Sequence, residues 1–215
     1  MPGIDKVVLL SGGLDSSVAL ASAVYSTQAG ASGVAAVSFD YGQRHGKLEL
    51  ACAVKQAERY GVSHVVVPVM PVFASSALTD ARKALPDAHF EDPVQQITVV
   101  PGRNLVFISL AAALAEAWGA GWLWIGAHVG DRAIYQDCRP EFIEAANHAL
   151  RLSGLKVRVL APFLGKTKVE IVALGRELGV DFGNTHSCYE GLLEPCGKCG
   201  ACRERQLAFD EVGGG

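Results

Sequence analysis

The sequence predicts an α/β protein whose parallel sheet carries helices on both faces, with a small four-cysteine module near the end of the chain. Short apolar runs alternate with helix-length stretches, which is the pattern of strands joined by helical crossovers. A glycine turn, Ser-Gly-Gly-Leu-Asp-Ser at residues 11–16, stands between the first apolar run and the first helical stretch. Four cysteines lie within residues 188–202. Together these features favour one nucleotide-binding type of domain with an appendage.

The first half of the chain predicts three strands and two helices. We expect strands at residues 6–10, 33–39 and 64–69, where the runs are short and apolar, and helices at 16–29 and 46–60. Residues 70–100 contain Pro71, Pro86 and Pro93, so they predict an irregular insertion over the sheet.

The second half continues the alternation. Residues 105–118 are apolar nearly all round and predict a buried helix. Strands follow at 122–126 and 157–160, with helices at 141–152, 166–178 and 202–210. We therefore expect an α/β domain over residues 1–183, a cysteine module over 184–212 packed on it, and a flexible tail over 213–215.

Composition limits the partners. The 19 basic and 22 acidic residues give a net charge of −3, which argues against binding duplex nucleic acid through its phosphates and favours a small-molecule substrate. Apolar runs stay short of the roughly 20 residues that a membrane span needs. The N-terminus lacks the pattern of a signal peptide. We expect a cytoplasmic protein, in which thiols stay reduced and the cysteines serve something other than disulfides.

The glycine turn has the features of a phosphate-binding loop. Glycines allow backbone N–H groups to face an anion, and the following helix start adds a favourable dipole. Ser11 and Ser16 can donate hydroxyl hydrogen bonds to phosphate oxygens, while Asp15 can cap the helix or organise the loop. A plain glycine turn is common in α/β proteins, but the whole string resembles the pyrophosphate loop of ATP pyrophosphatases, which release AMP and pyrophosphate. The residues that we expect to bind ATP are Leu10, Ser11, Gly12, Gly13, Leu14, Asp15, Ser16 and Ser17.

A second string, Gly165-Lys166-Thr167, imitates the end of a Walker A loop. That loop needs a glycine at position 160, where the chain has Leu160. Lys166 precedes a predicted helix, so it either reaches a phosphate or simply begins a surface helix.

Polar clusters follow apolar segments at residues 40–45, 101–104 and 128–139. Ligands of open parallel sheets bind beyond the carboxyl ends of the strands, so we expect these clusters and the phosphate loop to share one edge. Arg44, Arg103 and Arg139 can pair with carboxylate or phosphate oxygens. Asp131 and Asp137 can coordinate magnesium or contact a purine-like edge. Each charge taken alone is more often a solvated loop residue, and the convergence of the clusters favours a site.

The cysteines Cys188, Cys196, Cys199 and Cys202 are spaced C-x7-C-x2-C-x2-C. Four closely spaced thiolates favour a structural zinc ion with a closed shell. An iron–sulfur cluster is the main alternative, but ferredoxin runs carry their fourth cysteine downstream, followed by proline. His186 could replace one thiolate. A zinc ribbon for nucleic acid is disfavoured by the acidic balance of the chain.

Taken together, the motifs resemble the 7-cyano-7-deazaguanine synthase family, the nitrile-forming ligases of queuosine biosynthesis. The matching strings are residues 11–16, 39–45, 101–104 and 137–142 and the cysteine module, in the order of the family. The resemblance implies that ATP, with magnesium, adenylates the carboxylate of 7-carboxy-7-deazaguanine and that ammonia displaces AMP to give an amide. A second ATP then activates the amide, and elimination of AMP leaves the nitrile. The resemblance also implies a structural zinc ion and a homodimer.

The expected site follows from these strings. The catalytic residues that we expect are Asp15, Ser16, Arg103 and Asp131. The residues that we expect to bind the deazapurine acid are Phe39, Tyr41, Gln43, Arg44, Arg103, Asn104, Tyr135, Asp137 and Arg139.

One stretch departs from the family. Where the family commonly has Asp-aromatic-Ser-Gly-Tyr-Pro, residues 131–136 read Asp-Arg-Ala-Ile-Tyr-Gln and retain Asp131 and Tyr135. This loop should touch the substrate or the acceptor. An alternative function is therefore a ligase of the same fold that conjugates the activated acid to another amine, such as a protein N-terminus. Cys138 follows this stretch and either touches substrate or is a buried structural thiol.

Overall fold

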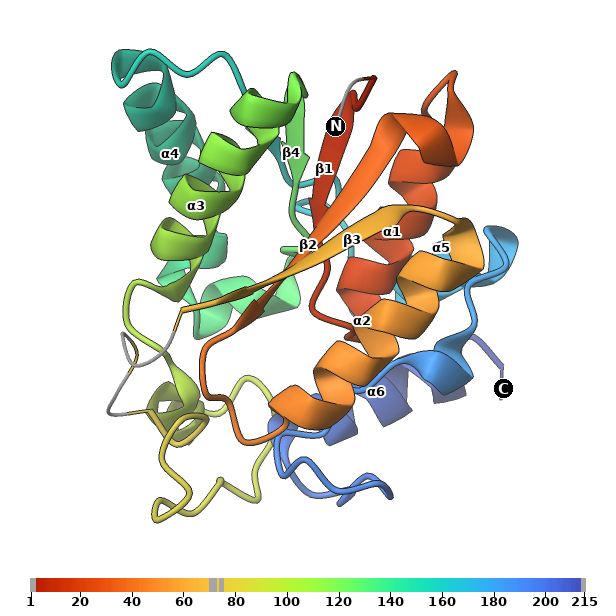
Figure 1. The fold of residues 1–215 in the computed structure, drawn as a ribbon. Helices are drawn as coiled ribbons and strands as arrows, with labels where there is room; N and C mark the ends of the chain where they lie inside the picture. Colours follow the sequence, from red (N-terminus) through yellow and green to blue (C-terminus); the bar gives the residue numbers. More distant parts are fainter. Residues whose placement is uncertain (1–2, 70–72, 74–75, 214–215) are drawn as a thin grey trace.

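The centre of the molecule is a five-stranded parallel sheet (Figure 1). The computed structural model describes residues 3–69, 73 and 76–213. Its strands are β1 (Lys6–Leu9), β2 (Val34–Asp40), β3 (Ser63–Pro68), β4 (Trp122–Trp124) and β5 (Arg158–Leu160). Their order is β3-β2-β1-β4-β5, and every neighbouring pair is parallel. The order reverses between β1 and β4, which is where open parallel sheets bind ligands.

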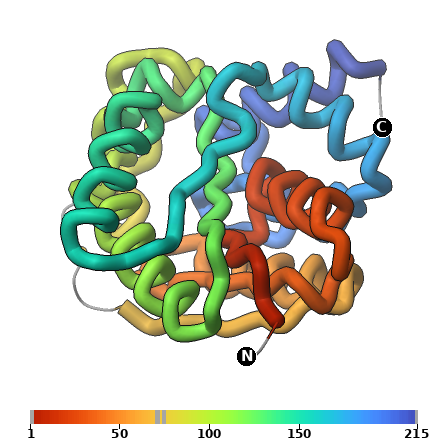
Figure 2. The backbone as a smooth tube through the Cα atoms, turned by 90° about the horizontal axis from the view of Figure 1, so that it is seen from above, coloured from red at the N-terminus to blue at the C-terminus, as the bar shows by residue number. Residues whose placement is uncertain are grey.

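Helices cover both faces of the sheet, as predicted (Figure 2). α1 (Leu14–Tyr25), α2 (Gly46–Tyr60) and α5 (Lys168–Glu177) lie on one face, and α6 (Gly200–Glu211) packs beside α5. α3 (Arg103–Trp118) and α4 (Pro140–Leu152) lie on the other. α1 begins two residues earlier than expected because Gly13 is its N-cap, and it ends at Tyr25 rather than at residue 29.

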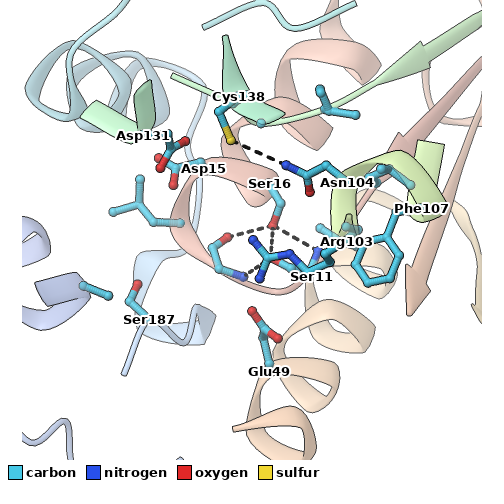
Figure 3. A pocket seen from close by; sticks show the side chains of 18 of the residues that line it. Ser11, Asp15, Ser16, Glu49, Arg103, Asn104, Phe107, Asp131, Cys138 and Ser187 are labelled. Atoms are coloured by element: carbon cyan, nitrogen blue, oxygen red, sulfur yellow. Dashed lines mark hydrogen bonds between the residues drawn. The ribbon is translucent and has the colours of Figure 1, made fainter. Parts of the chain in front are cut away.

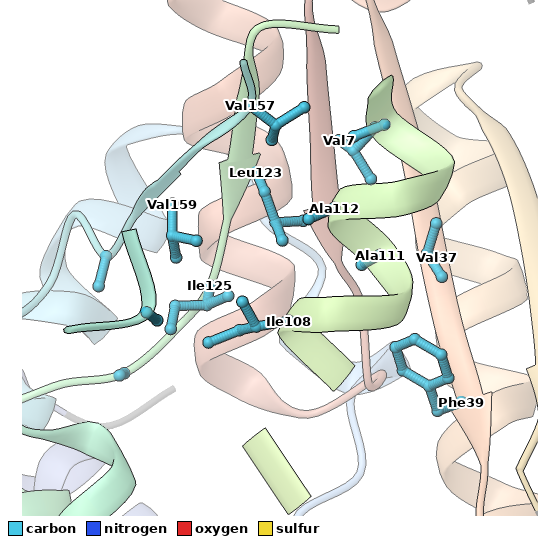
Figure 4. Packing of buried hydrophobic residues seen from close by; sticks show 14 of the residues in the cluster. Val7, Val37, Phe39, Ile108, Ala111, Ala112, Leu123, Ile125, Val157 and Val159 are labelled. Atoms are coloured by element: carbon cyan, nitrogen blue, oxygen red, sulfur yellow. The ribbon is translucent and has the colours of Figure 1, made fainter. Parts of the chain in front are cut away.

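The two faces of each strand bury different side chains. Val7 belongs to the core under α3 and α4, whereas Val8 belongs to the core under α1, α2 and α5. Figure 4 shows the first core, in which Val7, Leu123 and Ile108 meet between the sheet and α3. This alternation follows from the two-residue period of a strand. The sheet is thus anchored from both sides, and the loops at its carboxyl edge are held in place.

The expectation that α3 is buried all round is wrong. Ile108, Ala111 and Ala115 are buried, but Leu105 and Leu110 are 50% and 38% exposed. A helix that covers a sheet buries one side only, and the opposite side of α3 faces outward. Its apolar composition therefore does not reflect burial within this chain.

The cysteine segment packs beside the phosphate loop. The backbone N–H of His186 donates to the carbonyl of Gly12 at 2.9 Å, and α6 follows the segment. The division of the chain at residue 183 stays a prediction, since α6 and α5 pack together. The insertion over 70–100 contains a short 3-10 helix, Pro93–Thr98, while Pro71 lies outside the described residues. Gly214 and Gly215 of the predicted tail also lie outside them.

Within residues 3–69, 73 and 76–213, no helix has the length and apolar character required to cross a membrane.

Candidate active site

A cavity of about 270 Å³ opens at the carboxyl ends of β1, β2 and β4 (Figure 3). It brings together the phosphate loop, the start of α3 and the loop after β4. These three segments are far apart in the sequence but share one edge of the sheet. The predicted site residues that line it are Leu10, Ser11, Gly13, Leu14, Asp15, Ser16, Phe39, Tyr41, Arg103, Asn104, Asp131 and Tyr135.

The phosphate loop is held by its own serines. The Ser16 hydroxyl accepts from the backbone N–H groups of Ser11 and Gly12 at 3.2 and 3.3 Å and donates to the Gly13 carbonyl at 3.0 Å. The Ser17 hydroxyl also donates to that carbonyl, at 2.8 Å. The N–H group of Gly13 likewise donates to the Ser11 hydroxyl, at 3.1 Å. The loop thus offers the cavity its serine hydroxyls and the N-terminus of α1, a geometry suited to an anion.

Gly12 allows α2 to pack directly on this loop. Its φ is +93°, and a Cβ at this position would lie 2.0 Å from the Glu49 carbonyl oxygen and 2.7 Å from the Ala53 backbone nitrogen. No side chain fits there without moving a helix backbone. The glycine is therefore needed for close packing as well as for its backbone conformation.

Lys168 balances the charge of the phosphate loop. Its ammonium donates to Asp15 Oδ2 at 2.6 Å and lies 3.2 Å from Glu204 Oε2. Burial alone would lower the pKa of Lys168, but the two carboxylates raise it above its ordinary value. Burial alone would raise the pKa of Asp15, but Lys168 outweighs it and the pKa lies below its ordinary value. Both groups are charged at neutral pH.

His128 belongs to the same polar cluster as Lys168 and Asp15. The residue is 1% exposed, and its Nδ1 accepts from the Gly130 N–H at 3.0 Å, so the ring proton sits on Nε2. Nε2 faces the carboxylates of Asp131 at 3.5 Å, Glu204 at 3.8 Å and Asp15 at 3.9 Å. Three carboxylates on three different segments are thus held around one imidazole and one ammonium.

Arg103 supplies a fixed positive charge on the other side of the cavity. Its Nη1 donates to the Tyr41 hydroxyl at 3.2 Å. Burial opposes the charged form of Arg103, but Tyr41 and Tyr135 outweigh it and raise the pKa further above its ordinary value. A guanidinium that is permanently charged and partly sheltered is well suited to a carboxylate or a phosphate.

An aromatic wall stands beside this charge. The rings of Phe39 and Phe107 stack with centroids 4.3 Å apart, and Tyr41 meets Phe107 edge to face at 5.4 Å. Flat apolar faces of this kind accept a planar heterocycle.

Asn104 and Tyr135 line the cavity next to Arg103. The Asn104 backbone N–H donates to Asp137 Oδ2 at 3.3 Å, and its side chain donates to Cys138 Sγ at 3.5 Å. Cys138 is 6% exposed and lines the cavity, so the thiol is buried, while its contact with substrate stays a prediction. The Tyr135 hydroxyl shares hydrogen bonds with Thr98 at 2.8 Å and with Tyr189 at 3.4 Å, which fixes the ring.

Several predicted residues support the cavity without lining it. Arg44 forms an ion pair with Glu190 at 2.5 Å and donates to the Lys83 carbonyl, so it joins three segments. The Arg139 Nε donates to the Arg132 carbonyl at 3.2 Å. Gln43 folds back onto β2, where its Nε2 donates to the Phe39 carbonyl at 3.3 Å. The predicted residues outside the lining are Gly12, Ser17, Gln43, Arg44, Asp137 and Arg139.

Other lining residues escaped the sequence analysis. Lys168 stands two positions after Lys166. The capping box between Thr167 and Glu170 begins α5, and Lys168, the residue after Thr167, donates to Asp15. Glu49 and Glu204 lie on helices α2 and α6, where a single acidic residue carries no sequence signal. The additional polar residues of the lining are Ser38, His45, Glu49, Lys168, His186, Ser187, Tyr189, Glu204 and Arg205.

The four predicted cysteines form one cluster behind this site. Cys188, Cys196, Cys199 and Cys202 present sulfur atoms that all lie within 4.8 Å of one another, and the cluster could hold a metal ion. Sulfurs at such spacings fit a tetrahedral ion with metal–sulfur bonds of about 2.3 Å. His186 does not replace a thiolate, since its Nε2 bonds to the Cys188 carbonyl at 2.8 Å.

A parallel α/β sheet, a serine–glycine anion loop at its switch point and an adjacent four-cysteine cluster define a class of nucleotide-dependent proteins with an accessory metal site. The model of the family described as "Queuosine biosynthesis protein QueC" matches residues 5–213, and the chain belongs to this family.

Named relatives agree over nearly their whole length. A 7-cyano-7-deazaguanine synthase of Methanoregula boonei is 45% identical over 210 residues, which cover 96% of this chain and 94% of the relative. The synthase of Marinomonas sp. strain MWYL1 is 43% identical, with coverage of 96% and 94%. That of Pseudoalteromonas translucida is 40% identical, with coverage of 95% and 93%. The family resemblance drawn from the sequence is confirmed.

Proposed function

We propose that this protein converts 7-carboxy-7-deazaguanine and ammonia to 7-cyano-7-deazaguanine, consuming ATP and releasing AMP and pyrophosphate. The relatives bear the name of this synthase. Those names give no support to the alternative ligase that conjugates the acid to a protein amine.

The observation that carries the proposal is one cavity that joins the anion loop to an aromatic wall and a fixed guanidinium. The ATP phosphates fit the hydroxyls of Ser11 and Ser16 and the N-terminus of α1, with Lys168 as a further cation. A deazapurine ring fits against Phe39 and Phe107, and its carboxylate fits Arg103. Acid and nucleotide would then meet above Ser16, the geometry that adenylation needs.

Metal ions complete this proposal. Zinc held by Cys188, Cys196, Cys199 and Cys202 would be structural, because four sulfur ligands leave no open position. Magnesium would accompany ATP, with Asp131 among the carboxylates that line the cavity. The thiols need a reducing compartment to stay competent for metal binding, in line with the predicted cytoplasmic location.

We further propose a homodimer formed through the outward side of α3. Leu105 and Leu110 expose apolar surface there. Light scattering on Leu110→Glu should report a monomer. The matched control Leu152→Glu, at a leucine that is 74% exposed on α4, should remain a dimer. A monomeric wild-type protein at micromolar concentration contradicts the proposal.

The reaction is tested by chromatography of the products. ATP should be split to AMP and pyrophosphate only when the acid is present, and the enzyme should exchange labelled pyrophosphate into ATP under the same condition. Formation of ADP and phosphate excludes the proposed chemistry.

A further inference from the structure

Glu49 lies on the first turn of α2 and turns its carboxyl group into the cavity (Figure 3). The side chain is 14% exposed. In Figure 3 its carboxyl group points toward the Arg103 guanidinium and toward Ser11 of the phosphate loop. The close packing of α2 on Gly12 sets this position, since the Glu49 backbone touches that glycine. A carboxyl group is thus held where the loop and the fixed guanidinium face each other.

The other carboxylates of the cavity are already committed. Asp15 and Glu204 both contact the Lys168 ammonium, at 2.6 and 3.2 Å. Asp131 accepts from the His128 backbone N–H at 3.2 Å. A carboxylate held by a cation or by backbone donors is a weak base, because its charged form is stabilised.

Among the described residues, no lysine or arginine forms an ion pair with Glu49 within 4.0 Å. In the described part of the chain, its one ion-pairing neighbour within 4.0 Å is His45, whose Nε2 lies 3.6 Å away. Burial, Arg103 and His186 lower the pKa of His45 to about 4, so this ring is neutral near pH 7. The remaining contacts are hydrogen bonds from Gln43 Nε2 at 3.3 Å and from the Ser11 side chain.

This environment tunes the acidity of Glu49. Burial raises its pKa from an ordinary value of 4.5 to about 7, while the hydrogen bonds from Gln43 and Ser11 and the charges of Arg103 and His186 act in the opposite direction. Tyr41 and Cys52 are the other titratable groups that sense its charge. A group with a pKa near the working pH can both accept and release protons, which general acid–base catalysis requires.

We propose that Glu49 is a catalytic general base that takes protons from the nitrogen nucleophile, a role that rests on the function proposed above. Ammonium must lose a proton before its lone pair can attack the adenylated carbon. The C–N bond then forms, the C–O bond to AMP breaks with its electron pair, and the nitrogen loses a second proton to give the neutral amide. In the nitrile stage the O-adenylated amide sheds its N–H protons as AMP leaves. Each proton passes to the Glu49 carboxylate and then to solvent.

The test separates adenylation from amine attack. In Glu49→Gln, acid-dependent exchange of pyrophosphate into ATP should stay within about threefold of wild type, because adenylation needs no proton from nitrogen. Amide formation from ammonium should fall by a factor of about 10²–10⁴. Hydroxylamine, whose conjugate acid is far more acidic than ammonium, should restore product formation. The matched control is Glu58→Gln, an exposed glutamate of the same helix, which should behave as wild type.

A measurement on the wild-type enzyme needs no variant. With saturating ammonium, kcat should rise with pH through an apparent pKa near 7, and this limb should be absent with hydroxylamine. Unchanged ammonium turnover in Glu49→Gln overturns the proposal, as does an equal loss of exchange and turnover, which would indicate a structural role. If the wild-type enzyme itself shows no acid-dependent exchange, the proposed function fails before Glu49 is in question.

Discussion

At the phosphate loop a single lysine determines the charge of the site. Lys168 holds the carboxylates of Asp15 and Glu204, which come from opposite ends of the chain. Its side chain is 12% exposed, so the pair is weakly screened by solvent. Without the ammonium, two acidic groups would face the place where we expect the phosphates of ATP.

We therefore predict that Lys168→Met lowers pyrophosphate exchange by about 10²-fold, because a positioned cation is lost where charge develops. The free energy of unfolding should also fall by about 2 kcal/mol, since the buried carboxylates lose their partner. Lys166→Met is the matched control: Lys166 does not line the cavity, and both quantities should change little. Calorimetry measures the change in stability, and the exchange assay measures the loss of pyrophosphate exchange. Equal behaviour of the two variants would contradict the prediction.

Glu49 predicts a dependence of stability on pH that is separate from catalysis. Its pKa is raised from 4.5 to about 7 in the folded protein, so the native state binds the proton more tightly than the unfolded chain does. Its contribution to stability is therefore fully present below about pH 4.5 and is lost as pH rises through about 7.

Glu49→Gln removes the free-energy cost of ionising a buried carboxyl group at high pH. The free energy of unfolding of the variant relative to wild type should rise by up to about 3 kcal/mol between pH 4.5 and pH 8. Urea titrations at the two pH values measure it, with Glu58→Gln as the control that shows no such change. A difference that is the same at both pH values would show that Glu49 ionises freely in the folded protein.

On the scale of elements, the contact between α2 and the phosphate loop positions one wall of the cavity. Gly12→Ala would place its Cβ 2.0 Å from the Glu49 carbonyl oxygen, at a residue with φ of +93°. We predict a loss of more than about 3 kcal/mol of stability, with weak ATP binding in any folded fraction, because α2 must move away.

Gly61→Ala provides the matched control for this substitution. Gly61 ends α2 with φ of +64°, and a Cβ there meets nothing within 4 Å. Gly61→Ala should lower the free energy of unfolding only by the backbone penalty of about 1–2 kcal/mol and leave the KM for ATP unchanged. If the two variants are equally stable, the close approach of α2 to Gly12 does not cause the loss of stability in Gly12→Ala.

On the scale of the molecule, the cysteine segment and the nucleotide cavity form one unit. The His186 N–H bonds to Gly12, and Glu204 of α6 reaches Lys168. Cys199 is the N-cap of α6, and Cys202 lies within its first turn. Metal binding at the cysteines should therefore order parts of the cavity.

We predict that Cys196→Ser reduces bound zinc from one ion per chain to a small fraction and lowers both the melting temperature and pyrophosphate exchange. Elemental analysis, calorimetry and the exchange assay measure the three effects. Cys52→Ser is the control, since this half-buried thiol lies outside the cluster and should change none of them. A zinc-free Cys196→Ser enzyme with wild-type exchange would show that the module and the cavity are independent. Stoichiometric iron in place of zinc would indicate an iron–sulfur cluster at these cysteines.

The sequence by itself determined the fold class, the phosphate loop and the cysteine cluster. Each depends on local order: alternating apolar runs, a glycine string between a strand and a helix, and cysteines a few residues apart. The sequence also predicts which edge of the sheet carries the site, because parallel strands place the loops that follow them on one side. Tyr41 and Asp131, which follow β2 and β4, could be placed near the cavity on that ground alone.

The tertiary structure decided which side chains meet there. Lys168 pairs with Asp15 across 153 positions of the chain and also with Glu204 of α6, and no pattern within either helix marks these residues. It also assigned Arg44 to an ion pair with Glu190 rather than to the cavity lining, and turned Leu105 and Leu110 outward although residues 105–118 are apolar nearly all round. Periodicity reports which residues can be buried, but partners distant in sequence are set by the packing of whole elements. The acidity of Glu49 has the same origin, since it arises from burial against a loop and a helix that only the folded chain brings together.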